Sequence, residues 1–244
     1  MAHIFILFKR EFAGYFASPV AYVFIGIFLV LSSVFAFFIG GFYERGQADL
    51  LAFFNFHPWL YLFLVPAIAM RSWAEERKSG SIELLMTLPV STWQVTLGKF
   101  LAAWSVLGLA LILTFPLWLT VNYLGQPDNG IIVAAYLGSW LMAGAFLAIG
   151  MCMSALSKNQ IIAFILAIVV CFLFVVSGSS IVLDSFKGWA PSILLDTVAS
   201  FSFLTHFEAM AKGVIALNDL GYFFLVTVAW LYAGLLIIEQ KKAD

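Results

Sequence analysis

Long apolar runs recur along the chain, separated by short polar stretches. A helix needs roughly 20 apolar residues to cross the ~30 Å hydrocarbon layer of a bilayer. Six runs approach this length without an internal Asp, Glu, Lys or Arg. They predict six transmembrane helices at about residues 20–42, 55–70, 100–123, 131–156, 161–183 and 221–238. Only residues 157–160 separate the fourth run from the fifth, which predicts a very tight turn there.

Residues 1–18 form a separate amphipathic segment before the first run. On a helical wheel Lys9, Arg10 and Glu11 occupy a narrow charged face, and aromatic and aliphatic side chains fill the wide remainder. This pattern suits a helix lying along the inner membrane interface, and it suits equally an amphipathic flank without a partner. Ser18 is expected to cap the next helix, with Pro19 in its first turn.

The polar segment 71–99 is predicted to form three pieces. Residues 71–78 extend the second span, with Arg71 and Glu75 as an i,i+4 ion pair, until Gly80 ends that helix. Ser81 then caps a short helix that Pro89 terminates near residue 87. After Pro89 a capping box is expected to open the helix that becomes the third span; its members are Ser91 and Gln94.

The short helix after Gly80 must dock on another surface. Ile82, Leu85 and Met86 share one of its faces, and a helix of one or two turns is marginal alone in water. It packs either beneath its own transmembrane bundle or in a groove of a cytoplasmic partner. In the second interpretation three polar residues stand at the rim of the groove: Glu76, Arg77 and Glu83.

The outer segment, residues 184–220, is too apolar for a free loop. Its aromatic and aliphatic side chains predict re-entrant or surface-lying helices that close the outer end of the bundle. Packing is the default role of these side chains, and an outer gate is a hypothesis. The candidate gate residues are Phe201, Phe203, His206 and Phe207.

Composition places the chain among integral membrane proteins. Of its 244 residues 64% are hydrophobic and 10% are charged, against roughly 25% charged in soluble domains. Soluble enzymes and nucleic-acid-binding proteins are therefore excluded. Cys152 and Cys171 lie inside apolar runs and are interpreted as packing residues, not as disulfide or zinc ligands.

The distribution of lysine and arginine predicts the topology. Basic residues close to a span are retained on the cytoplasmic side. With both termini in the cytoplasm, nine of the twelve basic residues lie inside, and only Arg45, Lys187 and Lys212 lie outside. The asymmetry favours six crossings with both ends in the cytoplasm.

The chain lacks the motifs of an energy-consuming enzyme. It has no Gly-x-x-x-x-Gly-Lys-Ser/Thr phosphate-binding loop, and its three histidines are widely separated, so neither nucleotide hydrolysis nor a metal site is expected. Residues 177–180 are interpreted as a kink or close-packing site. Ion-coupled carriers hold ionisable groups near midmembrane, and none is visible in the six runs. Uphill transport would then draw its energy from a separate ATPase.

At this point a family resemblance becomes specific. The residues Glu76, Arg77, Gly80, Ser81, Glu83, Leu85, Pro89 and Val90 resemble the E-[RK]-x-x-G-[TS]-x-E-x-L-x-x-x-P-[VI] pattern of ABC-2 type permeases. Gly98 and Lys99 belong to the same resemblance. Further stretches resemble the gliding-motility-associated branch of that family: Lys9-Arg10-Glu11, residues 18–22 and 66–71, Asn159-Gln160, and residues 204–207 and 212–215.

The resemblance implies an all-α, six-helix half-transporter of the type V ABC exporter architecture in the bacterial inner membrane. Residues 1–18 would be its interface helix, Gly80 to Leu88 its coupling helix, and the outer segment its re-entrant helices. A separate ABC ATP-binding subunit would bind ATP and Mg²⁺, and this chain itself would need no cofactor. The implied partners are that subunit, a second identical or related permease, and a membrane-anchored protein with an extracytoplasmic domain.

Two functions are consistent with this sequence. The first is the permease subunit of an ATP-driven transporter, with export as the direction. The second is a membrane subunit that transmits ATPase work to an extracytoplasmic partner without passing any substrate. Both need the same coupling helix, so the sequence does not separate them.

Overall fold

Helices and connecting turns make up the described part of the chain, which in this computed structural model comprises residues 2–80, 90–186 and 191–241. No β-strand occurs within these ranges. The first half contains α1 (Ala2–Ala17), α2 (Val20–Val34) with its π-helical end η1 (Phe35–Ile39), α3 (Leu51–Asn55), α4 (His57–Ala69), α5 (Arg71–Ser79), α7 (Thr92–Ile112) and α8 (Phe115–Leu124). The second half contains α9 (Asn129–Leu156), α10 (Gln160–Val176), α11 (Ser180–Phe186), α12 (Ser192–Ser200), α13 (Phe203–Ala211) and α14 (Leu217–Gln240).

Four helical stretches in the described ranges are long and apolar enough to cross a membrane: Val20–Ile39, Thr92–Leu124, Asn129–Leu156 and Leu217–Gln240. The predicted runs 55–70 and 161–183 correspond to α4, of 13 residues, and α10, of 17 residues, which are shorter than the usual span. The six-crossing count therefore stays a prediction.

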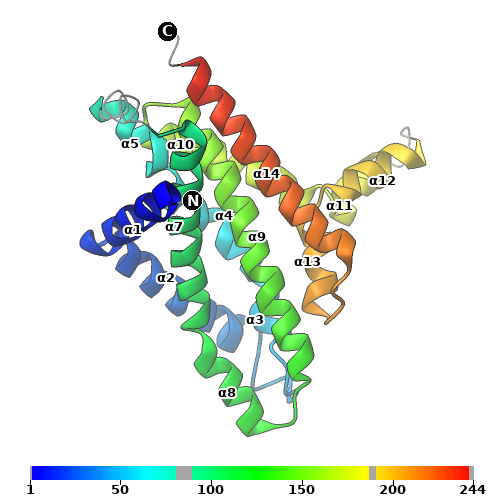
Figure 1. The fold of residues 1–244 in the computed structure, drawn as a ribbon. Coiled ribbons are helices and arrows are strands. Elements are labelled where there is room, and N and C mark those ends of the chain that lie inside the picture. Colours follow the sequence, from blue (N-terminus) through cyan, green and yellow to red (C-terminus); the bar gives the residue numbers. More distant parts are fainter. Residues whose placement is uncertain (1, 81–89, 187–190, 242–244) are drawn as a thin grey trace.

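The long α9 forms the centre of the bundle. It contacts α4, α5, α7, α10, α13 and α14, and Figure 1 shows α14 lying beside it. Small residues on α9 allow these close approaches: at Gly150 an added Cβ would lie 2.5 Å from the Ala69 Cβ of α4. α9 thus buries part of the surface of each of these six helices.

The amphipathic N-terminal segment is a helix that docks on the chain's own bundle. α1 packs across α7 and beside α2, with Leu7 buried and the rings of Phe8, Phe12 and Phe16 following one another along the contact. The predicted N-cap at Ser18 is wrong: its hydroxyl donates to the Tyr15 carbonyl at 3.3 Å. A capping residue needs an extended backbone, whereas the Ser18 N–H still bonds helically to residue 14.

The two ends of the molecule carry different segments. α5 and the C-terminal end of α14 lie at one end, and the α8–α9 connection lies at the other (Figure 1). α11 and α12 extend away from the bundle, and α13 returns to pack against α9. The small residues in the turn before α11 predict a kink or a close-packing site. The structure shows close packing there, because an added Cβ at Gly178 would lie 2.5 Å from the Ser202 Cβ.

Candidate functional site at the junction of α1, α5 and α7

A buried ion cluster joins three helices that are far apart in the sequence. The Lys99 Nζ of α7 donates to the Glu76 Oε1 of α5 at 2.6 Å and to the Glu11 Oε2 of α1 at 3.3 Å. The Lys99 side chain is 7% exposed, and the two carboxylates are about equally shielded, at 20% for Glu11 and 19% for Glu76. The same ammonium lies 5.4 Å from the ring centroid of the fully buried Trp73.

The local sequence explains why this lysine is buried. Gly98, its neighbour, lets α1 approach α7 closely, since an added Cβ would lie only 2.9 Å from the Leu7 Cβ. Lys99 follows at the second turn of a helix that is otherwise apolar, and an almost fully buried lysine requires a partner charge. One partner comes from α1, which packs against α7, and the other comes from α5, whose Glu76 and Trp73 reach the Lys99 ammonium.

α5 is also fastened to the C-terminal end of α9. The Ser154 hydroxyl donates to the Met70 carbonyl at 2.7 Å and accepts the Trp73 and Ala74 N–H groups at 3.1 and 3.0 Å. The Trp73 N–H belongs to the first turn of α5, where no carbonyl of its own helix can reach it, and the Ala74 N–H follows directly. Ser154 therefore caps α5 from a neighbouring helix.

A second link comes from Arg77. Its Nη1 donates to the Ala155 carbonyl at 2.7 Å, and the Lys241 Nζ donates to the Leu156 carbonyl at 2.6 Å. Positive charges at the last carbonyl groups of a helix stabilise the helix, because they interact favourably with the negative end of its dipole. Burial, together with the charges of Arg77 and Lys158, lowers the pKa of Lys241. The last turn of α9 is thus held by side chains from α5 and from the C-terminal end of the chain.

Both ends of the predicted coupling segment are locally well defined. Gly80 ends α5 in the left-handed region, at φ 74°, as its position predicts, and Arg71 pairs with Glu75 at 2.8 Å. The hydrogen bond from Arg71 lowers the pKa of Glu75. At the other end, Ser91 and Gln94 form the predicted capping box that starts α7. Ser81, Ile82, Glu83, Leu85, Met86 and Pro89 lie outside the described residues, so their role stays a prediction.

The structure places Glu76 and Arg77 differently from the groove-rim interpretation. Glu76 points to Lys99 and Arg77 to the end of α9, so both side chains bind the chain's own bundle. Of the predicted coupling residues that the structure describes, Glu76 and Arg77 attach the end of α5 to α7 and α9. Sequence reasoning missed Glu11, Lys99 and Ser154. The sequence feature that could have revealed this cluster is Lys99, a single lysine two turns into a mostly apolar helix.

The candidate outer-gate residues divide into two groups. Phe203 and Phe207 are buried packing residues, and the Phe203 ring lies 4.9 Å from Phe146 and 5.2 Å from Phe174, between centroids. Phe201 is 53% exposed.

His206, the fourth candidate, lies 2.6 Å from the Asp219 Oδ1 through its Nδ1, and its ring stacks on Tyr222 at 3.9 Å between centroids. The gating role of the four residues stays a prediction.

A further polar cluster lies inside the bundle. His57 is fully buried in α4, and its Nδ1 lies 2.7 Å from the Ser139 Oγ of α9, which also lies 2.7 Å from the Tyr61 hydroxyl. Within the described part of the chain the His57 Nε2 has no hydrogen-bond partner, and the rings of Phe53 and Phe54 lie against it. The cluster fixes α4 to α9. This cluster was not predicted from the sequence, where the histidines were considered only as metal ligands.

Comparison with known proteins identifies the family. The model of the ABC-2 family transporter proteins matches residues 42–237, which is well over half of the chain. No curated protein matches the sequence. The chain belongs to the ABC-2 transporter family and is the membrane permease subunit of an ABC transporter, a family whose members work with an ABC ATP-binding partner.

Replacing Lys99 tests whether the ion cluster holds the junction together. We expect Lys99→Met to lower the free energy of unfolding by ~3 kcal/mol, because it leaves two shielded carboxylates facing each other. Denaturant titration in detergent, followed by tryptophan fluorescence, measures the change. Lys78→Met is the matched control, because Lys78 is an exposed lysine of α5. A loss for Lys99→Met below about 1 kcal/mol, typical of a surface pair, would contradict the assignment.

The Glu11 carboxylate makes the junction sensitive to acid. Burial acts to raise its pKa, but the ammonium of Lys99 and the guanidinium of Arg10 outweigh burial and hold that pKa below its usual value of 4.5. Its contribution to stability is therefore complete above pH 4.5 and is lost as the pH falls through the folded-state pKa. Unfolding of the wild type and of Glu11→Gln, measured between pH 7 and pH 3, should differ at neutral pH and converge in acid. A constant difference over this range would argue against the pairing.

Proposed function

We propose that this permease subunit is driven by its ATP-binding partner through the segment that joins α5 to α7, and that the transporter works as an exporter. The single observation that carries this proposal is the ion cluster of Lys99 with Glu11 and Glu76. The segment lies in the sequence between Gly80, where α5 ends, and Ser91, where α7 begins, and the cluster binds these two helices to each other.

This arrangement would convert a push on the segment into movement of several helices. A displaced α5 pulls α7 through Glu76 and Lys99, and α1 follows through Glu11. Arg77 passes the same displacement to the end of α9. Met70 interrupts the helix between α4 and α5 for one residue, and Ser154 holds that joint against α9. Motion at the cytoplasmic end therefore reaches the central helix of the bundle directly.

The proposed assembly has two permease chains over two ATPase subunits, which bind ATP and Mg²⁺. Each permease chain contributes six crossings in a type V exporter arrangement, with both termini on the cytoplasmic side of a bacterial inner membrane. Six helices form only half of a transport path, so pairing of permeases is expected. Nucleotide closure would move the two coupling segments together and tilt the attached helices. Membership of the gliding-motility-associated branch, with an extracytoplasmic partner, is part of this proposal.

Charge reversal in the segment tests the coupling role. We expect Glu83→Arg to reduce copurification of the ATPase, or its permease-dependent ATP hydrolysis, by about tenfold, since it opposes the charge pattern of the docking face. Glu44→Arg makes the same change at an exposed residue on the predicted outer side and serves as the matched control. Both variants are measured in the complete complex.

The outcomes distinguish the candidate functions. Unchanged binding and hydrolysis in Glu83→Arg would overturn the coupling assignment. If the wild-type complex in sealed vesicles hydrolyses ATP but moves no solute or lipid, the mechanical alternative, in which ATPase work passes to an extracytoplasmic partner, replaces transport.

A further inference from the structure

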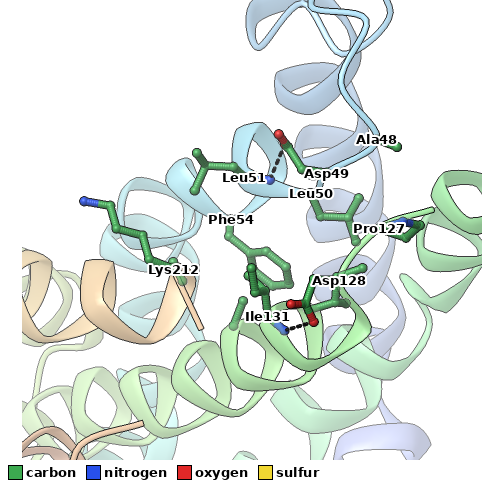
Figure 2. A pocket seen from close by; sticks show the side chains of 12 residues that line it. Ala48, Asp49, Leu50, Leu51, Phe54, Pro127, Asp128, Ile131 and Lys212 are labelled. Carbon is green, nitrogen blue, oxygen red and sulfur yellow. Dashed lines mark hydrogen bonds between the residues drawn. The ribbon is translucent and has the colours of Figure 1, made fainter. Parts of the chain in front are cut away.

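A pocket lies at the end of the molecule opposite α5, where three separate parts of the chain meet. It is lined by the start of α3, by the connection from α8 to α9 with the first turns of α9, and by the end of α13. Figure 2 shows its lining side chains around the ring of Phe54. Its volume is about 250 Å³.

The inner surface of the pocket is apolar. Leu50, Phe54, Ile132 and Ala135 form the floor, and they are all buried. Water gains few hydrogen bonds in such a space. The volume exceeds the ~150 Å³ of an apolar cavity that binds benzene and lies just below the ~300 Å³ of typical ligand pockets. It therefore fits one alkyl segment, not two complete acyl chains.

Charges of both signs stand at the mouth. Asp128 and Lys212 both line the pocket, and in Figure 2 they lie on opposite sides of the Phe54 ring. Asp128 accepts the Gly130 N–H at 2.8 Å through Oδ1 as the cap of α9. Asp49, also at the mouth, caps Leu51 and is paired with Arg45. A ligand head that carries one cation and one anion would complement the carboxylate of Asp128 and the ammonium of Lys212.

Close backbone contacts fix the walls of the pocket. An added Cβ at Gly213 would lie 2.7 Å from Ile131 Cγ1, and one at Gly125 would lie 2.5 Å from the Ala48 Cβ. Gly213 moreover has a φ of 87°, which favours glycine. The pocket is thus formed before any ligand arrives, which reduces the entropic cost of binding.

The surface beside the mouth is suited to lipid. Val214, Ile215 and Leu217 follow Lys212 in the sequence and are 58%, 48% and 84% exposed. Exposed aliphatic residues next to charged ones are typical of a membrane–water interface. In the proposed topology this end of the molecule faces the outer leaflet.

We infer that the pocket binds a zwitterionic glycerophospholipid of the outer leaflet. One alkyl segment enters the apolar floor over Phe54, the ammonium of the headgroup faces Asp128, and its phosphate faces Lys212. This inference concerns a bound lipid and does not require the coupling role of the segment after Gly80, so each can fail without the other.

Native mass spectrometry of the purified full chain in detergent tests the inference. The protein is titrated separately with dioleoyl-phosphatidylethanolamine, which is zwitterionic, and with dioleoyl-phosphatidylglycerol, which is anionic. We expect the zwitterionic lipid to bind more tightly. Asp128→Asn and Lys212→Gln should each weaken its binding by about two- to fivefold, the size of one exposed ion pair. Asn caps a helix as well as Asp does, so the first variant keeps the start of α9 intact.

Two further variants complete the test. Ala135→Leu fills the floor and should reduce binding of the zwitterionic lipid at least tenfold. Glu44→Gln removes an exposed charge outside the lining and should leave binding unchanged. Glu208 is unsuitable as a control because it pairs with Lys212 at 3.7 Å. Equal affinity for the two lipids, or wild-type binding in both Asp128→Asn and Ala135→Leu, would overturn the inference. Stronger binding of the anionic lipid would also overturn the inference, because the headgroup would then be recognised by the positive charge of Lys212 without a contribution from Asp128.

Discussion

The account depends on one constraint: a lysine buried in an apolar helix must keep its opposite charges beside it. Lys99 is 7% exposed in α7, and its two carboxylate partners come from α1 and α5. Separation of both helices from α7 would leave the Lys99 ammonium buried without compensation, which costs several kcal/mol. The three helices are therefore joined at the end of the molecule where α5 ends at Gly80.

This unit gives the family assignment a structural meaning. An ABC permease needs a route from a soluble ATPase into its transmembrane helices, and a short docking segment can transmit force only if its ends are fixed. Here Glu76 and Arg77 fix one end to α7 and α9, and the capping box at Ser91 fixes the other. In the proposed mechanism the central α9 would carry the displacement toward the opposite end of the molecule.

Local features could be predicted from the sequence, and contacts between distant residues could not. The Arg71–Glu75 pair, the left-handed Gly80 and the capping box of Ser91 each depend on residues within four positions, so helix geometry alone determines them. The Lys99–Glu11 and Ser154–Met70 contacts join residues 88 and 84 positions apart, and no local pattern encodes them. The Ser18 cap failed because the chain stays helical through that residue. The buried His57 cluster was missed since its partner Ser139 lies on α9, 82 positions away.

The most direct measurement of the central claim is a pair of spin-label distances in the complete complex, in a background without Cys152 and Cys171. One pair of labels is placed within a single permease, on the exposed residues Ala13 of α1 and Lys78 of α5. The other pair reports Lys78 in one permease against Lys78 in its partner. When nucleotide is trapped on the ATPase, the account predicts that the distance between the two permeases changes while the Ala13–Lys78 distance stays constant. A changed Ala13–Lys78 distance would show that α1 and α5 move separately and would contradict the account.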